Sequence, residues 1–252
     1  MTGLATEALT VRFGGFIAVN EVSLAIAPGS RHALIGPNGA GKTTLVQALT
    51  GGIRSSSGRV LLGGHDVTAM REYQRVRCGL SRTYQINQLF AGLTVAENVA
   101  LAIIERERKS TVFWRHAARD SAVADEVQIH LAFVNLADHA RRPVRELAYG
   151  LQRLLEIAIA LATRPRVLLL DEPAAGVPAA QSEAIFERLS DLPGDLTLLF
   201  VEHDMNLVFR FAERITVLAA GRVLAEGAPA DISANDQVRE AYLGRRGHHA
   251  AA

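Results

Sequence analysis

The chain has 252 residues, of which 49% are hydrophobic and 21% charged, and its 27 basic and 26 acidic side chains leave a net charge of +1. This composition is typical of a globular protein with one large domain or two small ones, and a near-neutral charge argues against a dedicated nucleic-acid-binding protein. Because Cys78 is the single cysteine, an intramolecular disulfide is excluded and a reducing compartment is favoured. Only two of the basic residues are lysines, Lys42 and Lys109.

The sequence predicts a chain without targeting or membrane-spanning segments. Its N-terminal stretch lacks the basic segment and apolar run of a secretory signal. The apolar runs near Glu97 and Glu156 are interrupted by these two charges, so neither reaches the roughly 20 apolar residues that span a bilayer. We therefore expect the chain to fold in water and to reach a membrane only through a membrane protein.

The first part of the chain has the pattern of short strands separated by turns rich in Gly, Pro and Ser. The strands are expected at Leu9–Phe13, Ser23–Ala27, His32–Ile35 and Arg59–Leu62. After about residue 90 the pattern becomes helical. Thr94 and Glu97 form a capping box that opens a helix through Ile104. A charged tract, Glu105 to Lys109, then leads to a second helix at Ala118 to Leu136.

The last third of the chain predicts a parallel sheet. A helix begins near Leu147, and two almost wholly apolar strands follow, Val167–Leu170 and Leu196–Val201, with a helix between them whose first turn holds Pro178. Strands without polar alternation are expected where helices cover both faces of a sheet. We therefore expect one α/β domain over residues 1–252, with a core of residues 1–90 and 163–235, a helical subdomain of residues 91–162 and a C-terminal tail of residues 236–252.

The strongest signal in the sequence is a phosphate loop, G-x-x-x-x-G-K-[ST], between the expected strand His32–Ile35 and a helical run. Its glycines let successive backbone N–H groups point at phosphates, and the start of the helix adds partial positive charge. We expect Lys42 to reach the β- and γ-phosphates and the Thr43 hydroxyl to bind Mg²⁺. The residues expected to hold the nucleotide are Gly36, Pro37, Asn38, Gly39, Ala40, Gly41, Lys42, Thr43 and Thr44.

Two carboxylates end the apolar strand that begins at Val167. Asp171 at the end of a strand beside the phosphate loop can hold Mg²⁺, usually through a water molecule, and Glu172 can orient or deprotonate an attacking water. Taken together with the phosphate loop, this pair favours hydrolysis over binding alone.

From about Leu9 to Ile232 the sequence resembles an ATP-binding cassette, the ATPase subunit of an ABC transporter. The resemblance implies a P-loop NTPase fold of the α/β class, with a RecA-like mixed-sheet core, an antiparallel β part and an inserted helical subdomain. It also implies an ATP hydrolase with ATP and Mg²⁺ as cofactors. The catalytic residues would be Glu172, His203 and Lys42, and the metal residues Thr43, Gln85 and Asp171.

Further motifs of the family match single residues. Phe13 matches the adenine-stacking aromatic residue, Gln85 the glutamine loop that senses Mg²⁺ and the γ-phosphate, and His203 the switch histidine. In the signature stretch Gly150 matches the family, whereas Ala148 stands where the family has serine. In the loop that usually contacts a second cassette, Pro178 replaces an aspartate.

The stretches LAYG, SRTYQ, DEPAAG and VEHDM, together with Gly221, resemble the LivG-type ATPase subunits of branched-chain amino acid importers. This resemblance implies a second ABC ATPase, identical or homologous, two membrane permeases, indirectly a periplasmic substrate-binding protein, and a peripheral position on the cytoplasmic face of the inner membrane. It implies no nucleic-acid partner. Urea or amide importers and lipopolysaccharide-type exporters have ATPases of similar layout and remain alternatives. A soluble ABC protein of DNA or ribosomes would carry two cassettes or a long coiled coil, and a P-loop kinase would lack these motifs.

Overall fold

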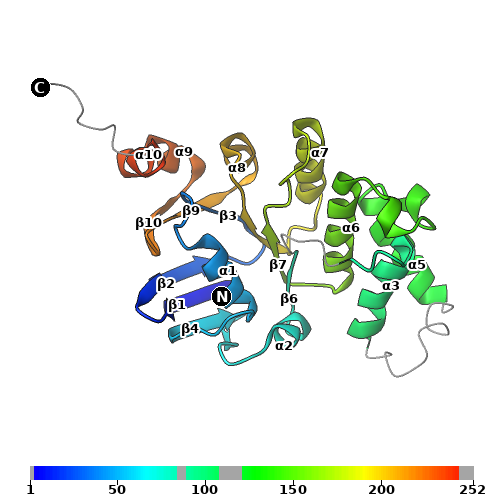
Figure 1. The fold of residues 1–252 in the computed structure, drawn as a ribbon, viewed down its shortest axis with the longest axis horizontal. Helices are drawn as coiled ribbons and strands as arrows, with labels where there is room; N and C mark the ends of the chain where they lie inside the picture. Colours follow the sequence, from blue (N-terminus) through cyan, green and yellow to red (C-terminus); the bar gives the residue numbers. More distant parts are fainter. Residues whose placement is uncertain (1–2, 84–88, 108–120, 244–252) are drawn as a thin grey trace, which may run out of the picture.

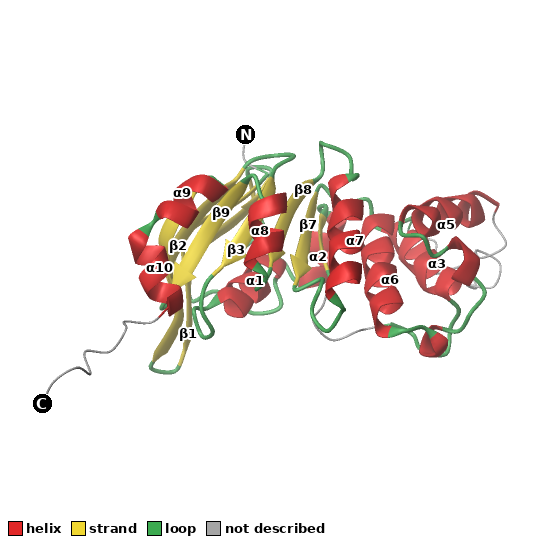
Figure 2. Ribbon diagram, turned by 90° about the horizontal axis from the view of Figure 1, so that it is seen from above, coloured by secondary structure: helices red, strands yellow, loops and turns green. Residues whose placement is uncertain are grey.

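The computed structural model describes residues 3–83, 89–107 and 121–243. In these ranges the chain forms a four-stranded antiparallel sheet, a six-stranded mixed sheet and a group of helices at one end (Figure 1). Helices lie on both faces of the six-stranded sheet (Figure 2). This arrangement confirms the predicted α/β class with an additional antiparallel part.

The antiparallel sheet begins with a long hairpin, in which Phe13 of β1 stands opposite Phe16 of β2. The strand order is β2-β1-β4-β5, and every neighbouring pair is antiparallel. Three predicted strands are confirmed here. The hairpin strands start earlier than predicted because pairing partners impose the extended form on residues of weak strand propensity, such as Ala5 and Glu7. The bounds are β1 (Leu4–Phe13), β2 (Phe16–Ile26), β4 (Ser57–Leu62) and β5 (His65–Asp66).

The six-stranded sheet has the order β10-β9-β3-β8-β7-β6. All its neighbouring pairs are parallel except the antiparallel pair of β9 with the edge strand β10. Strands β3, β7 and β8 confirm three predicted strands. Their carboxyl ends surround the phosphate loop. The bounds are β3 (Arg31–Ile35), β6 (Leu80–Arg82), β7 (Val167–Asp171), β8 (Thr197–Val201), β9 (Arg214–Ala219) and β10 (Arg222–Gly227).

The absence of polar alternation in β7 has a direct structural reason. Every residue of β7 is buried. Leu168 and Leu170 face the core that includes the helical end, whereas Val167 and Leu169 face the core between the two sheets. A strand with apolar contacts on both faces needs an apolar residue at every position, as the sequence predicted.

Helix α1 lies between the two sheets, and α7 and α8 lie on the other face of the six-stranded sheet (Figure 1). Two short 3-10 turns, at Ala137–His139 and Val144–Glu146, precede α6. The helix bounds are α1 (Lys42–Thr50), α2 (Glu72–Arg77), α3 (Val95–Arg106), α5 (Ser121–Phe133), α6 (Tyr149–Ala162), α7 (Ala179–Ser190), α8 (Met205–Phe211), α9 (Pro229–Ala234) and α10 (Asp236–Leu243).

The predicted capping box at the start of α3 is confirmed. The backbone N–H of Glu97 donates to Thr94 Oγ1 over 3.2 Å, and the backbone N–H of Thr94 donates to Glu97 Oε2 over 2.7 Å. These bonds satisfy two backbone donors that a helix start otherwise leaves without partners. The helix continues to Arg106, two residues beyond the predicted end.

Helices α3, α5 and α6 pack against one another at the end of the molecule opposite α10 (Figure 1). Their contact holds an ion-pair cluster around Glu126, whose carboxylate accepts from both Nη atoms of Arg106 over 2.6 and 2.8 Å. Arg164 lies 3.2 Å from the same carboxylate. The hydrogen bonds from Arg106 lower the pKa of Glu126 to about 2.

The Glu126 cluster should make the free energy of unfolding depend on pH in acid. A carboxyl whose pKa is lower in the folded state stabilises the fold fully above its unfolded pKa, here 4.5, and loses that contribution as the pH falls towards about 2. We expect Glu126→Gln to lower the free energy of unfolding at pH 7 by about 1 to 2 kcal/mol, since solvent screens part of this pair. Denaturant unfolding from pH 7 to pH 3 checks it: the difference from wild type should shrink below about pH 4.5. Glu105→Gln, in an exposed pair with Arg77, is the control and should change little at either pH.

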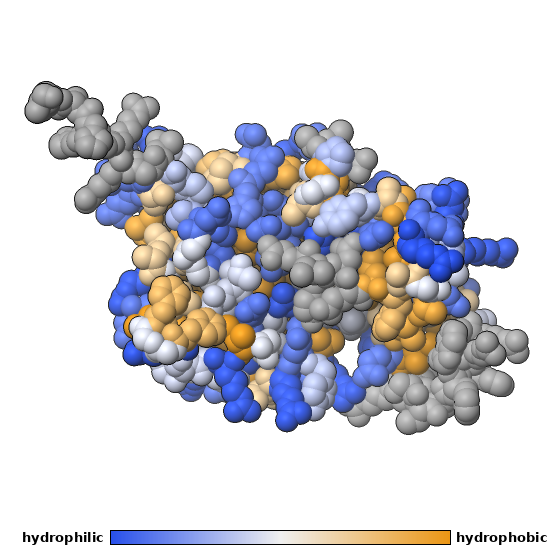
Figure 3. All heavy atoms as spheres, viewed as in Figure 1, coloured by the Kyte–Doolittle hydropathy of each residue, from blue (hydrophilic) through white to orange (hydrophobic). Residues whose placement is uncertain are grey.

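Residues 236–243, which the sequence assigned to a C-terminal tail, form α10, and residues 244–252 lie outside the described residues. The described residues contain no helix that is both long and apolar enough to cross a bilayer. On the face seen in Figure 3, hydrophobic side chains gather at the helical end of the molecule and beside the first hairpin. Hydrophilic side chains cover much of the rest of that face.

Candidate functional site

The phosphate loop joins β3 to α1, and two of its glycines adopt conformations that other residues avoid. Gly36 has a φ of 153°, and a Cβ there would lie 2.2 Å from the carbonyl oxygen of Leu218. Gly41, the N-cap of α1, has a φ of 101°, and its Cβ would lie 2.4 Å from the carbonyl oxygen of Ala18. The two glycines of the motif are therefore required by close backbone packing as well as by the turn itself.

Neighbouring strands hold this loop in place. The backbone N–H of Gly221, in the turn between β9 and β10, donates to the carbonyl of Ala40 over 3.0 Å. The carbonyl of Gly221 in turn accepts from the N–H of Asn20 in β2 over 2.8 Å. The loop is thus fixed by both sheets, which gives a structural reason for the glycine that the sequence singled out at position 221.

Lys42 is the first residue of α1, and its side chain is 7% exposed. Its Nζ donates to the carbonyl of Gly36 over 2.6 Å and to that of Pro37 over 3.1 Å, so the ammonium lies inside the curve of the loop. Burial lowers the pKa of Lys42, and the nearby carboxylates of Glu172 and Asp171 act in the opposite direction. The lysine is therefore a buried cation at the place where a phosphate would meet the loop.

Asp171 ends β7, and its side chain is 2% exposed. Among the described residues, neither of its carboxylate oxygens has a hydrogen-bond partner, and its backbone N–H donates to Thr83 Oγ1 over 3.4 Å. The nearest cation is Arg82, whose Nη2 lies 3.8 Å from Oδ2. Burial raises the pKa of Asp171, and the positive charge of Arg82 opposes that rise. Two buried acceptor oxygens without partners indicate that a further positive group belongs here.

Glu172 and His203 come from the ends of neighbouring strands and meet directly. Nε2 of His203 lies 2.8 Å from Oε1 of Glu172. Glu172 holds a left-handed backbone conformation, φ 51°, while its N–H donates to the carbonyl of Val201 over 3.0 Å. Residues other than glycine adopt this backbone conformation when the surrounding structure imposes it, and such residues cluster at functional sites. The sequence assigned both residues to catalysis, but their direct contact emerges only from the sheet.

Glu202 is a residue of this site that the sequence did not reveal. Its carboxylate is buried and accepts from the backbone N–H of Ala174 over 3.0 Å and from that of His203 over 3.1 Å. Burial raises the pKa of Glu202, and these backbone donors oppose the rise. The carboxylate thus fixes the start of the loop after Glu172 against the loop that carries His203. The signal in the sequence that could have indicated Glu202 is its position next to the predicted histidine, in VEHDM.

Replacing this carboxylate gives a prediction about positioning. Glu202→Gln keeps the size but offers a single acceptor oxygen to two N–H donors, so we expect the His203 loop to shift. Turnover of ATP should fall about tenfold, which corresponds to about 1.4 kcal/mol in the barrier, while the Kd for ADP stays within about twofold. Steady-state hydrolysis and titration with a fluorescent ADP analogue measure the two quantities. Glu7→Gln, in an exposed pair with Arg59, is the control, and equal losses in both variants would refute the role.

One pocket gathers most of the expected nucleotide residues. It is lined by Phe16, Ala18, Asn38, Gly39, Ala40, Gly41, Lys42, Thr43, Thr44, Glu172 and His203. Phe13, the expected stacking residue, is not part of this lining, whereas Phe16 is. Both phenylalanines are largely exposed at the end of the hairpin, 53% for Phe13 and 66% for Phe16. Pairing across the hairpin turn brings Phe16 to the pocket, and spacing along the chain carried no signal for it.

Gly150 lies elsewhere, in the first turn of α6, and lines a separate pocket with residues of α7 and α8. Ala148 is the N-cap of α6 and Pro178 that of α7, and neither supplies a side-chain hydrogen bond to its helix. Gln85 lies outside the described residues. The described chain therefore joins the phosphate loop to Glu172 and His203, and leaves Gly150 at a distinct surface.

The donor set at the loop suits Mg²⁺, which prefers oxygen ligands and usually keeps several waters. Asp171 offers two buried oxygens that have no hydrogen-bond partner in the described part of the chain, and Thr43 is exposed at the pocket. Among the described residues no group of three or more His, Cys, Asp or Glu side chains could hold a metal. An ion held mainly by phosphate oxygens and water needs no such cluster.

Comparison with known proteins identifies the family of the chain. Residues 19–175 match the ABC transporter family, and residues 222–248 match the branched-chain amino acid ATP-binding cassette transporter family. The high-affinity branched-chain amino acid transport ATP-binding protein LivG of Escherichia coli (strain K12) is 39% identical over 96% of this chain and 97% of its own. The cobalt import ATP-binding protein CbiO of Rhodobacter capsulatus is 40% identical over 91% of this chain and 80% of its own.

A solved structure agrees with these relatives. The crystal structure of the ADP conformation of an ATP-binding cassette of an ABC transporter matches this chain with a TM-score of 0.84 and 30% identity, and the match covers 97% of this chain and 99% of that one. The family match alone extends over more than half of the 252 residues, and it includes the phosphate loop, Asp171 and Glu172. The chain therefore belongs to the ABC transporter family and is one of its ATPase subunits.

Proposed function

We propose that this ATPase subunit powers an ABC importer for branched-chain or related amino acids, which pass through separate permease subunits. The observation that carries the proposal is the single pocket in which Lys42, the phosphate loop, Glu172 and His203 come together. The C-terminal match of residues 222–248 supports the choice of importer.

In this proposal the phosphate loop binds the phosphates of ATP. Backbone N–H groups at the start of α1 face the phosphates, and Lys42 exchanges its bonds to the carbonyls of Gly36 and Pro37 for phosphate oxygens. The adenine ring stacks at the hairpin end, where Phe16 lines the pocket and Phe13 stands opposite it. Thr44 completes the polar wall of the pocket.

Thr43, Asp171 and Gln85 would hold Mg²⁺ in this scheme. When bound, the ion neutralises charge on the phosphates. The two buried oxygens of Asp171, which have no partner among the described residues, support its part, and the exposure of Thr43 in the pocket supports the other. Gln85 is assigned by resemblance alone.

Glu172 orients the water that attacks the γ-phosphate and accepts its proton, and His203 contacts the γ-phosphate. Their contact of 2.8 Å supports a concerted role, because a hydrogen bond from the imidazole holds the carboxylate in one orientation before the nucleotide arrives. Catalysis then consists mainly of positioning and of charge stabilisation.

The start of α6 acts across a contact with a second ABC ATPase, identical or homologous. The start of α6 with Gly150 lies away from the phosphate loop of its own chain, which suits a role at the nucleotide of a partner. Two membrane permeases would receive the motion, and a periplasmic substrate-binding protein would deliver the cargo. The subunit would lie on the cytoplasmic face of the inner membrane.

Two relatives of nearly equal identity carry the names of different cargoes, branched-chain amino acids and cobalt. The match of residues 222–248 favours amino acids. A urea or amide importer and a lipopolysaccharide-type exporter are the alternatives that the sequence leaves open.

Purification of the tagged chain from its native membranes, followed by mass spectrometry, tests the proposal. Two permeases, a second ATPase and an associated periplasmic receptor that binds leucine would support it. A receptor that binds urea or amides but no amino acid would overturn the cargo. Export components without a receptor would overturn import itself. The Glu172→Gln variant should recover the same partners, since it keeps the size of one side chain inside the nucleotide pocket.

A further inference from the structure

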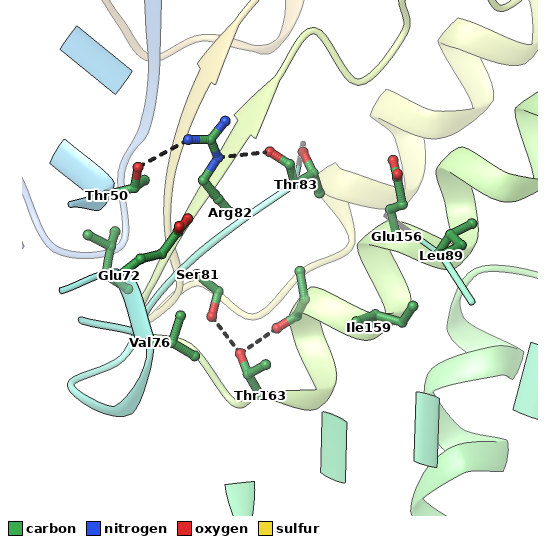
Figure 4. A pocket seen from close by; sticks show the side chains of 12 residues that line it. Thr50, Glu72, Val76, Ser81, Arg82, Thr83, Leu89, Glu156, Ile159 and Thr163 are labelled. Atoms are coloured by element: carbon green, nitrogen blue, oxygen red, sulfur yellow. Dashed lines mark hydrogen bonds between the residues drawn. The ribbon is translucent and has the colours of Figure 1, made fainter. Parts of the chain in front are cut away.

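A second pocket shares Arg82 with the surroundings of Asp171. It is lined by the end of α1, by α2, by β6 with Thr83, by Leu89, and by the C-terminal half of α6 (Figure 4). Its wall includes Thr50, Ser81, Arg82, Thr83 and Glu156. Arg82 belongs both to this wall and to the surroundings of Asp171.

Arg82 interacts with Thr50, Thr83 and Asp171. Its Nη1 donates to Thr50 Oγ1 over 3.1 Å, and its Nε donates to the carbonyl of Thr83 over 3.4 Å (Figure 4). Its Nη2 lies 3.8 Å from Asp171 Oδ2. The side chains of Arg82 and Asp171 are 10% and 2% exposed, so water screens this charge pair poorly.

The distance from Arg82 to Asp171 distinguishes this pair from a locked salt bridge. At 3.8 Å the guanidinium compensates the carboxylate electrostatically without a hydrogen bond, and both carboxylate oxygens keep their acceptor capacity. Other charges act on the same carboxylate, namely the cations Lys42 and Arg153 and the anion Glu172. Among the described residues, Arg82 is the cation that lies within ion-pair distance of Asp171.

We propose that Arg82 is an internal counter-cation of Asp171, which competes with the divalent cation of the nucleotide and links the occupancy of that site to the wall of the second pocket. The inference rests on the proposed role of Asp171. Two cations beside one carboxylate repel each other, so a divalent ion at Asp171 and the guanidinium at 3.8 Å are mutually unfavourable. A guanidinium displaced from Asp171 moves towards the second pocket, whose wall Arg82 already forms.

Arg82 is thus a positioning residue that acts through Asp171, and removing its charge has a defined effect on metal binding. In Arg82→Gln the buried carboxylate loses its counter-cation and attracts a divalent ion more strongly. We expect the Mg²⁺ concentration for half-maximal enhancement of fluorescent-ADP binding to fall about tenfold. The affinity for the same nucleotide in EDTA should stay within about twofold of wild type. A purely structural role would lower both affinities together.

Matched variants make this titration decisive. Arg82→Lys keeps the charge and should stay within about threefold of wild type in Mg²⁺ dependence. Arg82→Met keeps the aliphatic stem and should shift like Arg82→Gln, so that one poorly folded variant does not decide the result. Arg59→Gln removes an exposed cation paired with Glu7 and should change nothing. A shift below twofold in both neutral variants, or a weaker Mg²⁺ response in them, overturns the proposal.

Asp171→Asn separates this inference from the proposed function on which it rests. If that variant keeps the wild-type Mg²⁺ dependence, the metal assignment itself fails. If it loses the dependence while the neutral Arg82 variants match wild type, only the inference fails. An NMR spectrum of the protein with ¹⁵N-labelled arginine reports on the position of Arg82, whose Nε signal is the one missing from the spectrum of Arg82→Lys. This signal should shift when Mg²⁺ is added to the ADP-saturated protein. A signal that does not shift contradicts the link to the pocket.

Discussion

Glu172→Gln should bind ATP with a Kd within about threefold of wild type and hydrolyse it at least 100-fold more slowly, a loss of about 2.7 kcal/mol in transition-state stabilisation. Gln has the size of Glu and can accept the hydrogen bond that the imidazole now makes over 2.8 Å. It carries no negative charge to orient or deprotonate water. Nucleotide affinity is retained because the phosphates are held by the loop and by Lys42. Single-turnover hydrolysis and fluorescent-ATP titration measure the two effects.

Glu183→Gln is the matched control, because Glu183 lies on α7 in an exposed pair with Arg210. It should hydrolyse ATP at the wild-type rate. Turnover of Glu172→Gln within about threefold of wild type would remove Glu172 from the chemical step and leave the His203 contact a structural one.

Lys42→Arg should lower nucleotide affinity about 100-fold and abolish measurable turnover. The Nζ atom fits inside the loop, 2.6 Å from the carbonyl of Gly36, on a side chain that is 7% exposed. A guanidinium is a larger, planar group with a different donor geometry, so the same charge cannot occupy this curve of the backbone. The change therefore tests the geometry of the loop, since the charge is preserved. Titration with fluorescent ADP measures the affinity.

Lys42→Ala distinguishes charge from shape in this experiment, and thermal denaturation of both variants checks that the fold is retained. Affinity for ADP in Lys42→Arg equal to that of wild type would contradict the placement of the β-phosphate at this lysine. The chain has 25 arginines and two lysines, so a lysine at this position is consistent with a site that rejects arginine.

Signals along the chain predicted the parts of the fold that depend on local chemistry. The capping box of Thr94 and Glu97, the apolar strand before Asp171 and the phosphate loop each follow from residues within a few positions of one another. The match to the family motifs also identified His203, although it is far from Glu172 in the chain.

Contacts between distant segments were not predicted. Phe16 reaches the pocket because the hairpin pairs it with Phe13, Glu202 acts by joining two loops, and Arg82 faces Asp171 because β6 pairs with β7. No residue spacing in the sequence marks any of these contacts, since each depends on strand register and on which strands are neighbours. The contact of Glu172 with His203 likewise arises at the adjacent ends of β7 and β8.

We expect ATP to bind in the pocket between the hairpin end and the phosphate loop. Photolabelling with 2-azido-ATP in the presence of Mg²⁺ tests it most directly, followed by trypsin digestion and mass spectrometry. Cleavage after Arg12 and Arg31 releases one peptide that contains both Phe13 and Phe16. We expect the label on that peptide in the wild type, and its loss in Lys42→Ala and in the presence of excess ATP. Label confined to other peptides, or equal labelling in Lys42→Ala, would contradict the account.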